Sequence, residues 1–203
     1  MTDRFNILEK DTRDSFYTEF DRIAKKLLNK FQLKTLKNLY LIRELEFYYY
    51  SENHKDCYCH KNPRQLLNSS FYFHRFKDPE KYGRLKQKGI DITIGNTKDS
   101  YGGILIRAIQ DCKSNEIITG IGNLTNRIIE DIGGTEEING LYELNNCALN
   151  SDSGLRLEST QNNGLKIFKK PRQGLNHKKE DSERFFINAF YNYFTYPEII
   201  ELK

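Results

Sequence analysis

The 203-residue sequence lacks any apolar run of about 18 residues, the length that a membrane-spanning helix needs. Its first five residues also lack the apolar region of a signal peptide. These two absences predict a protein without a membrane partner. We expect it in the cytoplasm, associated with the nucleoid if the host is a bacterium.

Tryptophan is absent and cysteine is scarce. With no secretion signal, the four cysteines are expected to be free thiols rather than disulfides. Tyrosine and phenylalanine, by contrast, number 13 each, and they can serve as core, as an interface or as platforms that stack nucleic-acid bases. The net charge of +4 gives only weak support for a polyanionic partner, because such a charge is common.

The length suits one domain with a substantial core, so residues 1–203 are expected to fold as a single unit. Apolar periodicity predicts a helix over residues 12–31 and another over 123–132, which Gly133 would end. Strands are predicted over residues 71–74, 88–94, 103–109, 155–158, 165–168 and 185–195. The Asn-Asn-Gly sequence at 162–164 predicts a hairpin between two of them.

Residues 39–48 form the strand around which the rest is organised. Alternation of side chains predicts one face with Leu39, Leu41, Arg43, Leu45 and Phe47, and a second with Tyr40, Ile42, Glu44, Glu46 and Tyr48. Two carboxylates beside an aromatic ring indicate that water or a ligand reaches the second face. That face could simply be solvated. Alternatively, Glu46 is a catalytic base and Tyr48 a stacking platform.

Arg107 interrupts the nearly all-apolar strand 103–109. A buried arginine needs a carboxylate, a set of carbonyls or a phosphate as its partner. It could be structural, paired with Asp91 or Glu44, or it could lie at the floor of a functional site. The strand context alone favours neither interpretation.

Two basic segments could contact nucleic acid. Residues 75–87 combine basic residues with aromatic ones between two strands, which suits a nucleic-acid wedge or an ordinary solvated hairpin. Residues 166–179 carry six Lys or Arg and no acid. Most such runs are solvated, but this one lies in a structured region, and we expect Lys169, Lys170 and Arg172 to contact phosphates.

The loop after the key strand contains His54, Cys57, Cys59 and His60, which raises the possibility of a zinc-dependent hydrolase. The two cysteines, however, lack the usual gap of about two to four residues between zinc ligands. We therefore expect no metal site and no other cofactor. A loop that borders a cleft is the favoured interpretation.

Several short motifs, in order along the chain, resemble those of the alkylpurine (3-methyladenine) DNA glycosylase family. Residues 23–28 resemble its first packing helix. The other matches are ELEFY (44–48) to E-T-E-A-Y, YFH (72–74) to Y-V-Y, GILIRAI (103–109) to L-L-R-A-L, GIGNLT (120–125) to G-P-G-K-L-T, PRQGL (171–175) to P-R-I-G-I, and AFYNYF (189–194) to P-W-R-F-Y. Together they cover most of the chain, although none is long.

The resemblance implies an α+β fold: a single compact domain with a curved, mostly antiparallel sheet and flanking helices. It implies a monofunctional enzyme, which we expect to be a monomer, that flips a nucleotide out of double-stranded DNA and hydrolyses its N-glycosidic bond. Residue by residue, it makes Glu46 the base that activates water and Arg107 the arginine near that water. It also implies pocket and intercalating residues, namely Tyr48, His60, His74 and Tyr82.

The chemistry of the bond agrees with this assignment. Cleavage at C1′ develops positive charge on the sugar, which a neighbouring carboxylate stabilises while it takes a proton from water. The target base must leave the stack and is then held between aromatic faces. Glu46 and Tyr48 would supply both functions from one face of one strand.

The sequence leaves the substrate open. Gly95 falls where the family has an asparagine at the pocket floor, which would widen the pocket, and His74, His60 or Asp91 could protonate a neutral leaving base. One alternative is therefore antiviral removal of bulky bases such as glucosylated hydroxymethylcytosine, in place of repair of 3-methyladenine or hypoxanthine. Another is a non-catalytic nucleic-acid-binding domain, although a buried carboxylate near DNA would repel phosphate.

Overall fold

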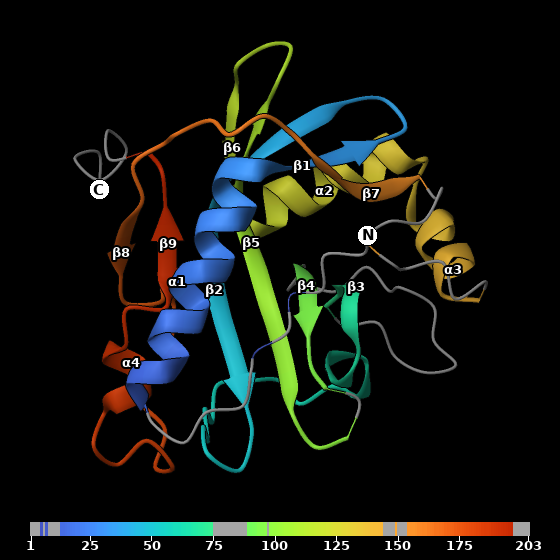
Figure 1. The fold of residues 1–203 in the computed structure, drawn as a ribbon. Helices are drawn as coiled ribbons and strands as arrows, with labels where there is room; N and C mark the ends of the chain where they lie inside the picture. Colours follow the sequence, from blue (N-terminus) through green and yellow to red (C-terminus); the bar gives the residue numbers. More distant parts are fainter. Residues whose placement is uncertain are drawn as a thin grey trace.

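In a computed structural model, the chain folds around a curled antiparallel sheet with helices packed against it (Figure 1). The structure describes residues 5, 7, 13–74, 89–96, 98–143, 149 and 154–196. The helices are α1 (Arg13–Lys30), α2 (Ile121–Ile132), α3 (Thr135–Glu143) and α4 (Phe185–Asn188), with a 3-10 helix, η1 (Pro63–Leu66). The strands are β1 (Phe31–Thr35), β2 (Leu39–Tyr50), β3 (Asn68–Phe73), β4 (Ile90–Ile94), β5 (Tyr101–Asp111), β6 (Ile117–Thr119), β7 (Leu155–Ser159), β8 (Phe168–Lys170) and β9 (Asn192–Phe194). The predicted α+β class with a curved antiparallel sheet is confirmed.

β2 and β5 form the centre of the sheet. They pair antiparallel from Tyr40 opposite Asp111 to Tyr50 opposite Tyr101. Beyond β5 lie β4 and β3, and beyond β2 lie β1 and β7, while β6 extends the pairing of β5. β9 pairs with residues 44–46 of β2 and carries β8 on its other side. β2 and β5 thus pair with different strands at different points along their length, and the sheet they form is curled.

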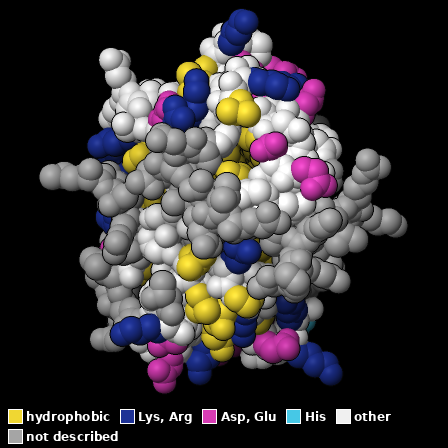
Figure 2. Space-filling view, turned by 90° about the vertical axis from the view of Figure 1, so that its right-hand side faces the viewer, with side chains coloured by type: hydrophobic (Ala, Val, Ile, Leu, Met, Phe, Trp, Pro, Cys, Tyr) yellow, Lys and Arg dark blue, Asp and Glu magenta, His cyan; other side chains and the backbone are white. Residues whose placement is uncertain are grey.

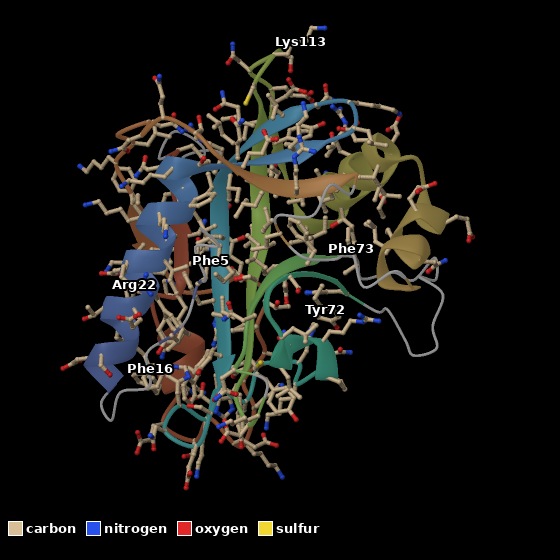
Figure 3. The ribbon with its side chains drawn as sticks, turned by 45° about the vertical axis from the view of Figure 1, so that its right-hand side comes forward. Phe5, Phe16, Arg22, Tyr72, Phe73 and Lys113 are labelled. Carbon is tan, nitrogen blue, oxygen red and sulfur yellow. The ribbon has the colours of Figure 1, made fainter. Side chains whose placement is uncertain are left out.

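α1 covers one face of the sheet and forms the main core with it (Figure 1). Its apolar side chains recur at three- and four-residue spacing, as predicted, and Phe20 stacks on Phe47 of β2 with ring centroids 4.4 Å apart. Phe16 points toward the sheet and Arg22 away from it (Figure 3). α2 adds to the same core and ends at Gly133, whose φ of 107° makes glycine the favoured residue there.

Two irregularities at the middle of β2 and β5 change which side chains share a face. The register shifts between Ile42 and Glu44, and again between Glu44 and Leu45. Simple alternation put Tyr40 and Ile42 with the carboxylates, and this was wrong: both lie in the main core with Leu45. Glu44, Glu46 and Tyr48 stay on the opposite face, as predicted. Bulges are common beside functional sites, because they re-aim side chains.

The C-terminal third departs most from the predicted elements. Residues 162–164 form no hairpin, because β7 pairs with β1 and β8 pairs with β9. The predicted closing strand over 185–195 is the short helix α4 followed by β9, and α3 was not predicted at all. The local Asn-Asn-Gly signal was overridden by pairing with strands distant in sequence.

Figure 2 views the side of the molecule that carries β3 and α3. Apolar side chains gather in its lower part, next to several Lys and Arg side chains. In the part of the chain that the structure describes, no helix has the length and apolar character needed to cross a bilayer.

Candidate active site

A row of side chains crosses the sheet on the face opposite the main core. The register of six strands aligns it: Tyr72 of β3 lies opposite Asp91 of β4, Asp91 opposite Leu105 of β5, Leu105 opposite Glu46 of β2, Glu46 opposite Asn192 of β9, and Asn192 opposite Lys170 of β8. Asp91 and Glu46 are separated by one strand, which corresponds to roughly 10 Å across the sheet. Two buried carboxylates therefore flank Leu105 on one face.

Glu46 is fully buried and surrounded by hydrogen-bond donors. Its Oε1 accepts from the backbone N–H of Gln173 at 2.8 Å and from Nδ2 of Asn192 at 2.8 Å. Its Oε2 accepts from the hydroxyl of Tyr48 at 2.9 Å and from Nη1 of Arg107 at 3.2 Å. Burial and the Glu46 charge hold the pKa of Tyr48 well above its usual value, so this hydroxyl remains a donor.

The second carboxylate of β2, Glu44, is held beside the first. Its Oε1 accepts from Nδ2 of Asn192 at 2.8 Å and lies 3.0 Å from Nζ of Lys170, and its Oε2 accepts from the hydroxyl of Tyr196. Burial raises its pKa, but the hydrogen bonds from Tyr196 and Asn192 and the charge of Lys170 outweigh burial and lower the pKa. The Nδ2 group of Asn192 thus donates to both carboxylates and reduces the electrostatic repulsion between them.

A cavity of about 240 Å³ opens on this face of the sheet. Five predicted site residues line it, namely Tyr48, His60, His74, Asp91 and Arg107. Arg107 bonds Glu46 and donates from Nη2 to the side-chain oxygen of Gln173 at 3.1 Å, while its Nε lies 3.8 Å from Glu44. The structure therefore places Arg107 in the site, with Glu46 as its nearer carboxylate.

The wall of the cavity formed by β3 and β4 carries a hydrogen-bonded chain. Nε2 of His74 lies 2.7 Å from Oδ1 of Asp91, and Oδ2 of Asp91 accepts from Nε2 of Gln65 at 3.2 Å. The oxygen of Gln65 accepts from the backbone N–H of Asn62, which fixes the orientation of its amide. The ring of His60 stands edge-on to His74, with centroids 4.8 Å apart.

Replacing Gly103 by alanine should disturb this wall. A Cβ at Gly103 would lie 2.3 Å from Oδ2 of Asp91 and 2.8 Å from Nε2 of Gln65, so both side chains would have to move. We expect a loss of about 1–3 kcal/mol in unfolding free energy, measured by urea denaturation. Gly140→Ala is the control, because a Cβ there meets nothing within 4 Å. An equal effect of the two substitutions would contradict the close packing.

Arg172 does not occupy the phosphate-binding position that its charge suggested. Its side chain is fully buried, donates to both oxygens of Asp56 at 2.6 and 3.1 Å, and lies over the Tyr48 ring with 4.5 Å from Cζ to the centroid. It also donates to the carbonyls of Phe47 and Phe186. Arg172 is therefore a buried structural residue behind the site, and the predicted DNA contact is wrong for it.

The two neighbouring lysines point to opposite faces of the sheet. Nζ of Lys169 bonds Asp21 on α1, whereas Nζ of Lys170 reaches Glu44 on the cavity face. Alternation along β8 separates them, which a charge count along the sequence cannot show. Tyr82, with the rest of the basic segment 75–87, lies outside the described residues.

Gly95 does not widen the cavity. It is absent from the residues that line the cavity, and a Cβ there would lie 2.1 Å from the carbonyl oxygen of Gln65. Gly95 permits β4 to pass close to the backbone of η1. The argument for an enlarged pocket from this glycine is therefore wrong.

The two histidines of the zinc hypothesis, His54 and His60, lie in different surroundings. Both ring nitrogens of His54 are hydrogen-bonded, to the carbonyl of Tyr49 at 2.8 Å and to the hydroxyl of Tyr191 at 2.9 Å, and burial lowers the pKa of this histidine. Within the described ranges, three or more His, Cys, Asp or Glu side chains are nowhere grouped as metal ligands. His60, in contrast, borders the cavity.

Four contributors to the site were missed in the sequence: Gln65, Gln173, Asn192 and Tyr196. Gln65 follows Asn62-Pro63, a helix-start signal that would have placed a short helix in the loop. Gln173 acts through its backbone N–H and its side-chain oxygen, for which the sequence gives no signal beyond the turn around Gly174. Asn192 reaches both glutamates only through the pairing of β9 with β2.

Fold and site together define an α+β protein with a buried carboxylate beside a cavity lined by polar and aromatic side chains. No family model matches the chain. It is 36% identical over 188 residues to "Uncharacterized protein L759" of Acanthamoeba polyphaga mimivirus, and the match covers 85% of each chain. The chain belongs to the same protein family as that viral protein.

Proposed function

We propose that this protein is a monofunctional DNA glycosylase, which flips a modified nucleotide into the cavity and hydrolyses its N-glycosidic bond. The observation that carries the proposal is Glu46, a buried carboxylate whose donors Tyr48 and Arg107 also line the cavity. A domain that only binds nucleic acid gains nothing from a carboxylate at this place, because it repels phosphate. The resemblance of several short motifs, in order, to those of the alkylpurine DNA glycosylases supports the same function.

Oε2 of Glu46 is the oxygen that we assign to the reaction. Both of its donors, Tyr48 and Arg107, border the cavity, whereas one of the two donors to Oε1, Asn192, is fully buried and does not border it. Water bound beside Arg107 replaces the Tyr48 hydrogen bond to Oε2, attacks C1′ and gives its proton to Glu46. The carboxylate also stabilises the positive charge that develops on the sugar as the base departs.

The size of the cavity favours a single base. Its volume of about 240 Å³ lies below the roughly 300–1,000 Å³ of pockets that hold drug-sized ligands. A purine or pyrimidine with a small modification suits this space better than glucosylated hydroxymethylcytosine does. Repair-type substrates are therefore our first candidates, and the antiviral substrate is the alternative.

Incubation with a set of DNAs tests the proposal. The set contains duplexes with alkylated purines, duplexes with hypoxanthine, and phage DNA with glucosylated cytosine. Alkali cleavage then reports abasic sites, and mass spectrometry identifies the free base. Release from the first two classes alone supports a repair-type substrate, and release from phage DNA alone supports the antiviral alternative. Tight binding without release from any DNA would favour a non-catalytic binding domain.

Lys170→Gln should weaken DNA binding in a salt-dependent way. Lys170 lies on the cavity face with its side chain 26% exposed, so it can reach a phosphate of the flipped strand. Loss of one phosphate contact should reduce the slope of log K against log salt by about one. Lys169→Gln is the matched control, because Lys169 faces α1 and should leave the slope unchanged. Equal slopes for the parent protein and the Lys170 variant would mean that Lys170 contacts no phosphate and is part of the ordinary solvated surface.

A further inference from the structure

We propose that His74, oriented by Asp91, is the general acid that protonates a neutral leaving base, so that uncharged modified bases are the substrate class. This inference rests on the proposed function and names the substrate of the same cavity. Two acidic groups lie on the same face of the sheet. Glu46 lies on β2, the His74–Asp91 pair lies on the β3–β4 side, and Leu105 of β5 lies between them.

The hydrogen-bond chain fixes which nitrogen of His74 is available. Oδ2 of Asp91 accepts from the amide of Gln65, and Oδ1 lies 2.7 Å from Nε2 of His74. A carboxylate accepts at both oxygens, so Nε2 carries a proton toward Asp91. The proton that can be exchanged with a ligand is then on Nδ1. This is the arrangement in which an aspartate orients a histidine for acid–base chemistry.

Two glycines make room for the pair. A Cβ at Gly89 would lie 2.6 Å from Nδ1 of His74, and a Cβ at Gly103 would lie 2.3 Å from Oδ2 of Asp91. The small residues at both positions thus allow the imidazole and the carboxylate to occupy the wall. A structural histidine in the core would not need to border a cavity, whereas both His74 and Asp91 do so.

The proton balance of the reaction explains why an acid is needed. As the bond between C1′ and the base breaks, its electron pair leaves with the base. A cationic alkylated purine accepts that pair and becomes neutral, so it requires no proton. A neutral base would leave as an anion, unless Nδ1 of His74 gives a proton to a ring nitrogen or carbonyl oxygen. Meanwhile the water oxygen bonds C1′, and its proton passes to Glu46.

The described groups around His74 are few and can be named. Asp91 faces it from β4, His60 from the loop that follows β2, Tyr72 from its own strand with ring centroids 5.2 Å apart, and Gln65 stands behind Asp91. Arg107 of β5 borders the same cavity. In this setting, loss of the acid should slow release of a neutral base and leave release of a cationic base unchanged.

The test compares two substrates in two variants under single-turnover conditions. One duplex carries hypoxanthine, a neutral base, and the other carries 7-methylguanine, a cationic one. His74→Gln keeps an amide donor for Asp91 but has no ring proton to give. We expect it to lower hypoxanthine release by about 10²–10⁴-fold and to change 7-methylguanine release by less than about threefold. Asp91→Asn should lower hypoxanthine release in the same selective way.

The cationic substrate also reports folding, because an unfolded variant would release neither base. Equal loss of both activities in His74→Gln, or unchanged hypoxanthine release, would overturn the role of His74 and leave the glycosylase proposal intact. Release of only the cationic base by the parent protein would also overturn the role of His74 and leave the glycosylase proposal intact. Release of no base by the parent protein, whether from these duplexes or from the glucosylated phage DNA, would overturn both proposals.

Discussion

Replacement of Glu46 by glutamine is expected to abolish base release while DNA binding is retained. Glutamine keeps the shape of the side chain but accepts no proton from water and carries no charge to stabilise the developing oxocarbenium ion. Loss of general-base catalysis alone corresponds to about 10²–10⁴-fold in rate. The measurement is the single-turnover rate of base release from the substrate that the parent protein processes, with DNA affinity measured in parallel.

The environment of Glu46 calls for a folding control. Four donors point at its oxygens, so the amide group of glutamine would face at least one N–H or O–H donor. Urea denaturation of the variant separates a loss of chemistry from a loss of structure. Arg107→Lys serves as a second variant that retains the positive charge near Oε2. A folded Glu46→Gln protein that releases base at nearly the parent rate would point to Glu44 or Asp91 instead.

Replacement of Arg172 by methionine is expected to destabilise the fold by about 3–5 kcal/mol. The substitution leaves Asp56 as a buried carboxylate without its bidentate partner and frees the carbonyls of Phe47 and Phe186. Burial disfavours the charged form of Arg172, but the charge and hydrogen bonds of Asp56 outweigh burial and raise the pKa of the guanidinium. The guanidinium of Arg172 therefore stays charged throughout the pH range in which the protein would be studied.

Equilibrium urea denaturation measures this loss, and a double-mutant cycle assigns it. Asp56→Asn combined with Arg172→Met should cost less than the sum of the single substitutions, because no unpaired charge remains buried. Lys169→Gln removes the exposed ion pair to Asp21 and should cost at most about 1 kcal/mol. A loss below that value for Arg172→Met would contradict a structural role.

The sequence predicted the long elements and the two faces of the central strand from Glu44 onward. α1, α2 and the strands that contain Glu46, Asp91 and Arg107 were found because periodicity and β-branched or aromatic content are local signals. Glu46 and Tyr48 were placed on one face correctly, because both lie beyond the two irregularities of β2. Tyr40 and Ile42 were not, because a bulge is set by strand pairing and leaves no local trace.

Features that depend on distant pairing could not be read from the chain. Asn192 meets Glu44 and Glu46 only because β9 pairs with β2, and Gln173 follows β8 into the site by the same pairing. The charge of Arg172 suggested a contact at the surface. Its partner is instead the buried carboxylate of Asp56, which lies 116 residues earlier in the sequence. Gly95 was assigned to the pocket by counting along a strand, whereas its contact with η1 requires the fold.

Mass measurement of both products from one modified duplex tests the central claim most directly. The protein is incubated with a duplex that contains a single hypoxanthine or 7-methylguanine, and the strand and the small-molecule fraction are weighed without alkali treatment. Hydrolysis by a Glu46-activated water predicts an uncut strand that has lost the base and gained one water, together with an equal amount of free base. A strand of unchanged mass after complete binding would contradict the claim.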